Sequence, residues 1–361
     1  DGKTSVLEMM QEELKKHVFK TLDFYYPTCI DHEQGGYING FLDDGTINDT
    51  TTKHLVATSR YIYNFSIGAI LGGGDHYLEA ARHGIRFLNE HHRDHQHNGY
   101  YFEVDDTEVE NPAKMAYGHA FVVIAAAAAV VAGIDARDLL DDALTVLDER
   151  FWDEDERMFV DEWNRDFTVL DSYRGQNANM HLVEAMMLAT EVTGEGRYLE
   201  RAVSIAERLI RDVTARNDGR LPEHFAERWV FDPEYNSHDR DNLFRPYGSI
   251  IGHWLEWARL LIQLDAATGG AHPWLVPAAR RFFDQGLAEG WDPRHSGFGY
   301  AVDWSGRVIN SDRYHWVITE AIGAAVALYR ATGDEETARW YERFWEYAAA
   351  RHIDPADGSW V

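Results

Sequence analysis

The stretch ANMHLVEAMMLAT (178–190), read as a helix, is apolar around nearly its whole circumference, and only His181 and Glu184 interrupt it as strongly polar groups. The next stretch, RYLERAVSIAERLIRD (197–212), instead places its apolar residues on one stripe and its charges on the opposite face. An enclosed helix followed by a helix with one buried face is typical of a helical hairpin that has an inner and an outer member. We expect 178–190 to lie inside and 197–212 to lie outside.

This alternation repeats along the chain. Short glycine-and-aromatic pieces, typical of tight turns, recur at positions 36, 99, 158, 219, 297 and 358, with separations of 63, 59, 61, 78 and 61 residues. About sixty residues hold two ordinary helices and their connections. Further helices are predicted at 5–26, 53–71, 76–91, 116–132, 136–150, 246–266, 273–288, 313–332 and 335–350. We therefore expect an all-α fold, a single domain over 1–361 in which six helical hairpins close into a toroid with short β-hairpin pieces in its loops.

Composition excludes several classes of partner. The 61 acidic residues against 34 basic ones give a formal charge of −27, which disfavours nucleic acid and anionic membranes. Only six of the basic residues are lysines, and this acid-rich, lysine-poor balance is typical of a salt-loving source. The lone cysteine, Cys29, forms no internal disulfide or zinc cluster, and the longest apolar stretch, 121–132, is shorter than the ~20 residues that span a bilayer. We expect a cytoplasmic protein, and the sequence leaves its oligomeric state open.

Basic residues mark the starts of the predicted inner helices. Lys53, Lys114, Arg174, Arg245 and Arg313 are spaced 61, 60, 71 and 68 residues apart, which matches the hairpin period. The polar groups around them should therefore face one end of the ring. Since isolated buried polar groups are costly, we expect them to surround a cavity and form its mouth.

Two inner helices carry a His-x-x-Glu pattern, His181–Glu184 and His253–Glu256, and each pattern places an imidazole and a carboxylate on one helical face. Each pattern alone is more typical of a hydrogen-bonded core histidine, but two of them beside His315 and Glu320 on a third helix indicate a functional site. Di-iron bundles use the reverse order, Glu-x-x-His, with further glutamates, so we predict no metal site.

Aromatic residues adjoin these polar groups. Trp254, Trp316, Tyr117 and Tyr247 lie next to the predicted mouth. Aromatic faces beside hydrogen-bonding groups suit a polyhydroxylated ligand. For Trp254, plain packing between helices explains the spacing equally well.

Several long motifs resemble the N-acylglucosamine 2-epimerase superfamily, which includes cellobiose 2-epimerases and the mannose and sulfoquinovose isomerases. The motifs are RGQNANMHLVEA (174–185), LPEHF (221–225), RPYGSIIGHWLEW (245–257) and HWVITEA (315–321). The resemblance implies an (α/α)6 barrel and sugar chemistry without a bound cofactor, whether metal or nicotinamide. His315–Trp316 stands where the epimerase branches tend to carry Trp-Trp. This variant is more similar to the mannose-isomerase branch and favours a monosaccharide as the substrate.

The resemblance and the clustered histidines lead to a hypothesis for the reaction, an aldose–ketose isomerisation of D-mannose and D-fructose through a cis-enediolate. In this hypothesis His253 is the base, Glu256 orients it, and His315 assists ring opening and moves protons between oxygens. The other site residues would bind or position the sugar: Arg60 as the main donor to the enediolate oxygen, Asn177 and His181 as supporting contacts, Glu184 holding His181, Glu320 fixing the start of the His315 helix, and Trp254, Trp316 and Tyr117 shaping the pocket.

Three alternatives stay open. A sugar 2-epimerase of the mannose/glucose or cellobiose type would use the same residues. A glycoside hydrolase would need two carboxylates ~5–9.5 Å apart, for which Glu184 and Glu256 are candidates. A non-catalytic carbohydrate-binding protein is the third. The polar connection 231–244 is predicted to be either a lid over the site or a solvated loop.

Overall fold

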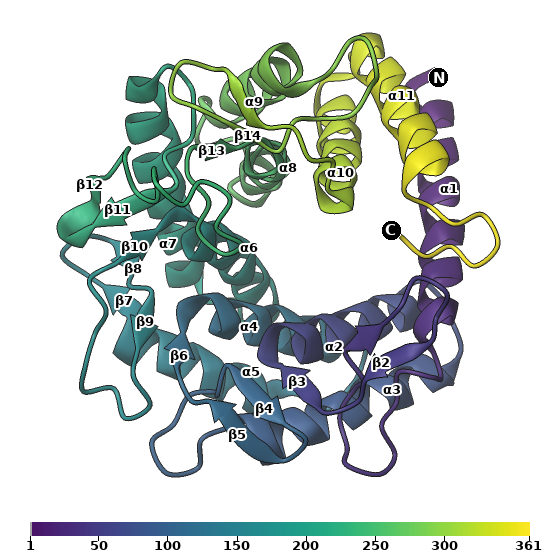
Figure 1. Cartoon of the computed structure of the whole chain (residues 1–361), viewed down its shortest axis with the longest axis vertical. Helices are drawn as coiled ribbons and strands as arrows, with labels where there is room; N and C mark the ends of the chain where they lie inside the picture. The colour runs from purple at the N-terminus through teal and green to yellow at the C-terminus, as the bar shows by residue number, and fades with distance from the viewer. Residues whose placement is uncertain (1) are drawn as a thin grey trace.

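The chain folds as a ring of helices. A computed structural model describes residues 2–361, with side chains from residue 5 onward, and contains eleven α-helices (Figure 1). Their bounds are α1 Gly2–Tyr25, α2 Leu55–Ile70, α3 Asp75–Phe87, α4 Ala116–Val131, α5 Arg137–Val146, α6 Gln176–Thr193, α7 Gly196–Ala206, α8 Ile251–Ala267, α9 Leu275–Gly290, α10 His315–Thr332 and α11 Glu335–Arg351. The predicted all-α ring of helical hairpins is confirmed.

The helices form two layers. α2, α4, α6, α8 and α10 line the inside of the ring, and each packs against the outer helix that follows it in the chain (Figure 1). The inner helix α4 is buried almost all round, whereas the outer helix α7 buries one stripe. Burial therefore follows the alternation of the sequence, because a helix surrounded on every side must be apolar on every side.

Helix α1 belongs to the outer layer. It lies between α3, where Tyr77 donates to Asp23 at 2.9 Å, and α11, where Tyr341 donates to Glu13 at 3.4 Å. Among the residues that the structure describes, the inner layer thus has five helices and the outer layer six. The side of the ring between α10 and α2 is bordered by α1 together with Trp345 and Trp360.

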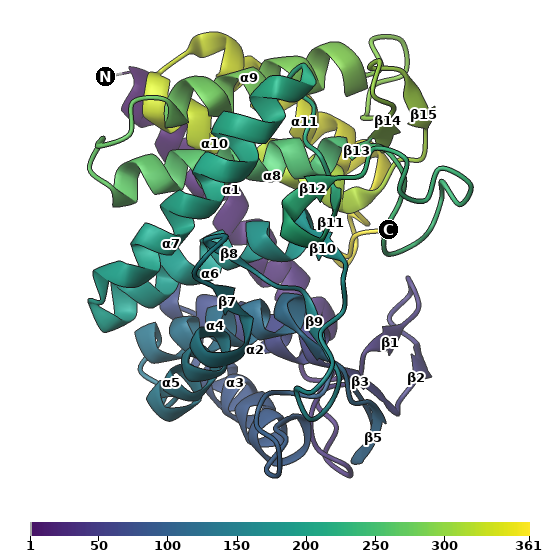
Figure 2. The same ribbon diagram turned by 90° about the vertical axis from the view of Figure 1, so that its left-hand side faces the viewer.

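Short strands gather mostly at one end of the ring, which Figure 2 shows from the side. Their bounds are β1 Gly40–Phe41, β2 Ile47–Asp49, β3 Thr52–His54, β4 Glu103–Asp105, β5 Glu108–Asn111, β6 Lys114–Met115, β7 Trp152–Asp153, β8 Met158–Phe159, β9 Glu162–Trp163, β10 Arg174–Gly175, β11 His224–Ala226, β12 Val230–Phe231, β13 Ser249–Ile250, β14 Ala301–Val302 and β15 Val308–Asn310. Strands β3, β6, β10 and β13 directly precede inner helices, and each pairs antiparallel with a strand from a later loop. These pairs fix where the inner helices begin.

Most predicted helices agree with the structure to within a few residues. The helix predicted at 246–266 begins only at Ile251, because Ser249 and Ile250 pair with β14. The outer stretch 197–212 is α-helical to Ala206 and ends in a π-helical turn over Glu207–Thr214. None of the helices in the described part of the chain combines the length and hydropathy that crossing a bilayer requires.

Two of the basic residues expected at the mouth are instead buried in the fold. Lys53 pairs with Asp31 at 2.6 Å, and Lys114 pairs with Asp94 at 2.9 Å, and both lysine side chains are fully buried. The Lys114 ammonium also donates to the carbonyl oxygens of Asn98 and Arg165 at 2.6 and 2.7 Å. Each lysine therefore ties the start of an inner helix to the turn that follows the preceding outer helix, and neither is free to bind a ligand.

We expect Lys114→Met to lower the free energy of unfolding by about 3–5 kcal/mol, because the buried carboxylate of Asp94 loses its ammonium partner and keeps Arg165, at 3.3 Å, as its remaining counter-charge beside two backbone N–H donors. Urea unfolding measures the loss. The exposed Lys15 offers a matched control, and Lys15→Met should change stability by less than about 0.5 kcal/mol. Equal effects of the two substitutions would contradict this account of the buried pair.

Candidate active site

A cavity of about 2360 Å³ opens inside the ring. Its lining includes every residue predicted for the site except Trp254: Arg60, Tyr117, Asn177, His181, Glu184, His253, Glu256, His315, Trp316 and Glu320. These residues come from all five inner helices. A second part of the cavity, beside α1, is lined largely by apolar side chains, including Leu14, Val18 and Leu22. A small polar ligand would therefore be held at the part where the predicted residues converge.

The carboxylate that holds His253 is Glu223, which the site prediction did not include. His253 Nδ1 lies 2.7 Å from Glu223 Oε1, and the Gln176 amide nitrogen lies 2.9 Å from the same oxygen. The second carboxylate oxygen of Glu223 accepts from the backbone N–H of Ile250 at 3.2 Å. Glu223 and Gln176 are buried, and His253 keeps a small exposed edge.

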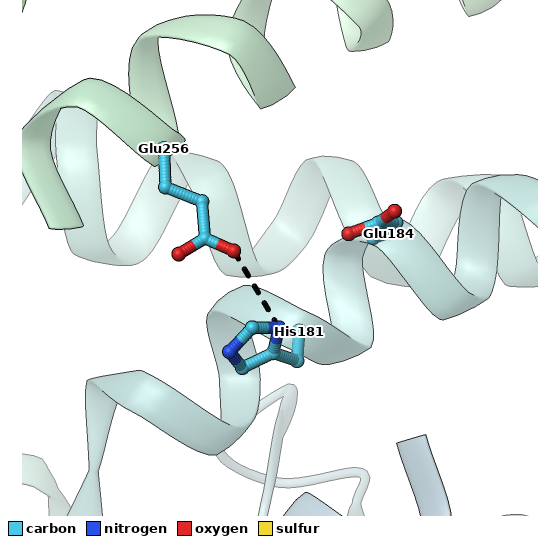
Figure 3. A group of neighbouring side chains, drawn as sticks. All are labelled: His181, Glu184 and Glu256. Atoms are coloured by element: carbon cyan, nitrogen blue, oxygen red, sulfur yellow. Dashed lines mark ion pairs between the residues drawn. The ribbon is translucent and has the colours of Figure 1, made fainter. Parts of the chain in front are cut away.

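Glu256, which we expected beside His253, faces His181 of α6 instead. Glu256 Oε1 lies 3.6 Å from His181 Nδ1 (Figure 3). That nitrogen has no hydrogen-bond partner among the described residues, although it is buried. Burial, followed by the positive charges of Arg60, His253 and Arg259, lowers the pKa of His181 well below its usual range. His181 is therefore a neutral imidazole near pH 7.

Arg259, also absent from the site prediction, joins three glutamates. Its guanidinium lies 3.9 Å from Glu184, 3.8 Å from Glu256 and 3.5 Å from Glu320. Burial and then the charge of Glu320 raise the pKa of Glu256 well above its usual value, and burial also raises the pKa of Glu320. The structure thus places Glu184 and Glu320 against Arg259, rather than in the expected roles of holding His181 and the start of the His315 helix.

The group His181, Glu184 and Glu256 has donor atoms within 4.8 Å of one another, a spacing that could hold a metal ion (Figure 3). However, the Arg259 guanidinium lies within 3.9 Å of both carboxylates. A divalent cation would have to bind beside this fixed positive charge, which makes the donor set unfavourable for it. The absence of a catalytic metal stays a prediction.

Arg60 presents a free cation to the cavity. Its guanidinium lies over the Phe121 ring at 4.7 Å and has no carboxylate within 4.0 Å in the described part of the chain. Phe121 also packs against Tyr117 and His181, with ring centroids 5.1 and 4.8 Å away, which places Arg60 near both. Tyr117 also packs edge-on against His181, with ring centroids 5.2 Å apart. Arg60 is therefore positioned to donate hydrogen bonds to oxygens of a bound ligand.

The start of α10 also lines the cavity. Trp316 lies against the His253 ring with a centroid distance of 5.5 Å. His315 is exposed at the cavity edge, and its imidazole makes no hydrogen bond to any side chain or backbone group of the described residues. Partial desolvation, then the charges of His352 and Arg60, lower the pKa of His315. His253 and His315 thus border the same cavity.

Trp254 does not belong to the site. Its side chain is fully buried, donates to Ser249 Oγ at 2.7 Å and packs near Phe282 of α9. Successive residues on a helix point about 100° apart, so Trp254 must turn away from the cavity that His253 faces. The packing interpretation of Trp254 is the right one.

The connection before α8 reaches the cavity rim. Tyr235, Asn236, Leu243 and Phe244 contribute to the lining, and the side chains of Leu243 and Phe244 are 75% and 82% exposed. His224 anchors the end of this connection, because its Nε2 lies 2.7 Å from the carbonyl oxygen of Pro246. Two exposed apolar side chains beside an open cavity favour the lid interpretation over a solvated loop.

Comparison with known proteins identifies relatives along the whole chain. Residues 35–361 match the family model described as N-acylglucosamine 2-epimerase (GlcNAc 2-epimerase). A D-mannose isomerase of Marinomonas mediterranea is 36% identical over 96% of this chain and 88% of its own length. A D-mannose isomerase of Thermobifida fusca is 42% identical over 78% of this chain and 70% of its own length. A crystal structure of D-mannose isomerase superposes with a TM-score of 0.93 at 36% identity, covering 97% of this chain and 89% of the other. Cellobiose 2-epimerases match at 21% identity.

Arg259→Met should lower the free energy of unfolding by about 2–4 kcal/mol at pH 7.5, because three neighbouring carboxylates lose their common counter-charge. The pKa values of Glu256 and Glu320 are already raised in the folded protein and should rise further in this variant. The folded state then binds protons that the unfolded chain does not bind, so its stability falls as pH rises. The loss should therefore be smaller at pH 5.5 than at pH 7.5.

Urea unfolding at the two pH values measures this difference. Arg137→Met removes an exposed pair with Asp141 and serves as the control, with an expected loss under about 1 kcal/mol at both pH values. A loss for Arg259→Met that is as small as this, or that does not depend on pH, would contradict the proposed charge balance.

Proposed function

Because the chain belongs to the N-acylglucosamine 2-epimerase family, we propose that it is an aldose–ketose isomerase that interconverts D-mannose and D-fructose. The observation that carries the choice of reaction is the 36–42% identity to proteins described as D-mannose isomerases, against 21% to cellobiose 2-epimerases. The cavity adds the chemistry that such a reaction requires: an imidazole held by a carboxylate, a free guanidinium and aromatic walls.

His253 is the base in this proposal. Its Nδ1 is engaged by Glu223, so the ring nitrogen left for a ligand is Nε2. The imidazole removes the proton from C2 of open-chain mannose, and the electron pair of the broken C–H bond forms the C1–C2 double bond of a cis-enediolate while the carbonyl oxygen at C1 takes up charge. Return of a proton to C1, with the C2 oxygen becoming the carbonyl, gives fructose.

Arg60 stabilises the enediolate. The C2 proton of a sugar is very weakly acidic, so removing it needs preorganised donors where negative charge develops. No carboxylate of the described residues pairs with the Arg60 guanidinium, which faces the cavity near Tyr117 and His181. Asn177 lines the same wall and supplies an additional amide donor.

His315 opens the pyranose ring and moves the proton between the C1 and C2 oxygens. It lies at the cavity edge, on the residue before Trp316, whose indole packs against His253. The lowered pKa of His315 leaves it mostly neutral near pH 7, and a neutral imidazole can both accept and donate a proton. The reaction as proposed uses neither a metal nor a nicotinamide.

The other functions are less well supported. A 2-epimerase would return the proton to C2 on the opposite face after the enediolate rotates, and Leu243 and Phe244 at the rim could restrict such rotation. A glycoside hydrolase acting through Glu184 and Glu256 is disfavoured, because both carboxylates lie against one guanidinium. A binding protein would have no need for a carboxylate-held imidazole in its pocket.

Incubation with D-mannose in D2O, followed by NMR, tests the proposal. We expect fructose that carries deuterium at C1, since the proton taken by His253 exchanges with solvent before it returns. His253→Asn should lower kcat by about 10²–10⁴-fold. Deuterium at C2 of glucose without any fructose would indicate an epimerase, and tight binding without product would indicate a binding protein.

The exposed His95 supplies the control, since His95→Asn removes an imidazole that lies away from the cavity lining. Prior dialysis against EDTA should leave the rate unchanged, which tests the cofactor-free part of the proposal. Loss of activity on dialysis and its recovery with one metal would overturn that part alone.

His315→Asn should lower kcat by about 10²-fold in both directions, because proton transfer between the sugar oxygens loses its catalyst. The position of the label in the product should not change, since His253 still transfers the carbon-bound proton. Steady-state rates with mannose and with fructose measure the effect, and His295→Asn, at an exposed position, is the matched control. An unchanged kcat would show that another group serves the oxygens.

A further inference from the structure

We infer that Glu223 and Gln176 form a positioning pair that keeps the proton of neutral His253 on Nδ1 and so presents an unprotonated Nε2 to the substrate. This inference rests on the proposed role of His253 as the base. It assigns a function to the LPEHF segment, which lies thirty residues before His253 in the chain.

The strand pairs of the ring bring these residues together. Glu223 directly precedes β11, which pairs with β10 at the start of α6, and the backbone N–H of Gln176 donates to the Glu223 carbonyl at 3.1 Å. The Glu223 side chain then crosses to the start of α8, where it accepts from the N–H of Ile250. Glu223 is thus fixed between two inner helices, with its Oε1 against the His253 ring.

The orientation of the Gln176 amide follows from Trp257. The indole N–H of Trp257 donates to Gln176 Oε1 at 2.9 Å, so the oxygen of the amide faces the tryptophan. The NH2 group must then donate to Glu223, at 2.9 Å, and its nitrogen lies 3.0 Å from His253 Nδ1, which accepts no hydrogen bond from it when Nδ1 carries a proton. Both Gln176 and Trp257 are fully buried, so bulk solvent does not compete for this hydrogen bond.

These contacts set the proton on His253. Both oxygens of Glu223 act as acceptors, one for the Ile250 N–H and the other for the Gln176 amide. An ionised carboxylate only accepts, so the 2.7 Å contact with His253 requires a proton on Nδ1. The neutral imidazole therefore has its lone pair on Nε2. When the ring takes the substrate's proton, the same carboxylate stabilises the imidazolium.

Other groups near His253 add little charge of their own. Burial lowers the pKa of His181 on α6 and of His224 on β11, so both are neutral near pH 7. Burial and the charge of Glu223 raise the pKa of Tyr300, so this phenol is neutral near pH 7. Trp316 of α10 packs against the His253 ring and carries no charge. Glu223 is therefore the charged group that acts most directly on the His253 ring.

Glu223→Gln tests the inference. A glutamine cannot accept from Ile250, Gln176 and His253 as a carboxylate does, and its own NH2 group favours a proton on Nε2 instead. We expect kcat to fall by about 10²–10⁴-fold with KM changed less than about threefold, as when an orienting carboxylate is replaced by its amide elsewhere. The acid limb of the kcat/KM profile should move to lower pH, because an amide stabilises the imidazolium less than a carboxylate does.

Nitrogen-15 NMR of histidine-labelled protein reads the proton position directly, with the His253 signals assigned by their absence in His253→Asn. The proton should lie on Nδ1 in the native protein and move, wholly or in part, to Nε2 in Glu223→Gln. Glu223→Asp keeps the charge and should retain the native tautomer at a reduced rate. Glu227→Gln, at an exposed position on the same segment, should change neither signal nor rate.

Trp257→Phe provides a second route that leaves Glu223 intact. It frees the Gln176 amide to rotate and should lower kcat by about 3–10-fold, in keeping with the loss of one hydrogen bond. An unchanged His253 tautomer and an unmoved acid limb in Glu223→Gln would overturn the inference, whatever happens to kcat. A changed tautomer combined with full activity of His253→Asn would instead overturn the role of His253 as the base and leave the positioning pair standing.

Discussion

The antiparallel strand pairs that precede four of the five inner helices determine where most polar groups of the cavity lie. β3, β6, β10 and β13 each hold the first turn of an inner helix against a strand from a later loop. Backbone hydrogen bonds in such pairs fix the register, and a shift of one residue would turn each following side chain to another direction. Glu223 shows the effect most directly, because the pairing of β10 with β11 carries it to His253.

Of two arginines that line the cavity, one is paired with carboxylates of the described residues and the other is not. Arg259 compensates three glutamates, whereas Arg60 faces the cavity without a carboxylate partner in the part of the chain that the structure describes. Positive charge that is already neutralised attracts a polar ligand weakly, so the free guanidinium dominates the field that a bound anion would meet. The neutral state of His181 keeps a second cation from competing with Arg60.

Much of this arrangement could be predicted from the sequence. The alternation of enclosed and one-sided helices predicts the two layers, and His-x-x-Glu spacing predicts that His181 and Glu256 both face inward. Which carboxylate meets which imidazole depends on how α6 and α8 cross, and a spacing within one helix contains no information about that. The spacing places Glu256 near His253, but the structure pairs it with His181.

Glu223 lies in the loop before β11, which has no helical or strand periodicity in its sequence. Only the motif LPEHF therefore indicated that this segment matters. Trp254 could have been assigned correctly from helix geometry alone, because it follows directly after His253 on one helix. Lys53 and Lys114 were misplaced for a different reason. Their partners Asp31 and Asp94 lie in turns that belong to the previous hairpin, and the sequence shows the period of those turns but not their contacts.

The two buried lysines have a practical consequence for handling the protein. The four remaining lysines, at positions 3, 15, 16 and 20, all belong to α1, and Lys15, Lys16 and Lys20 are exposed. Reagents that couple to primary amines would therefore attach along one outer helix. A resin activated for amine coupling should hold the molecules by that edge and in similar orientations.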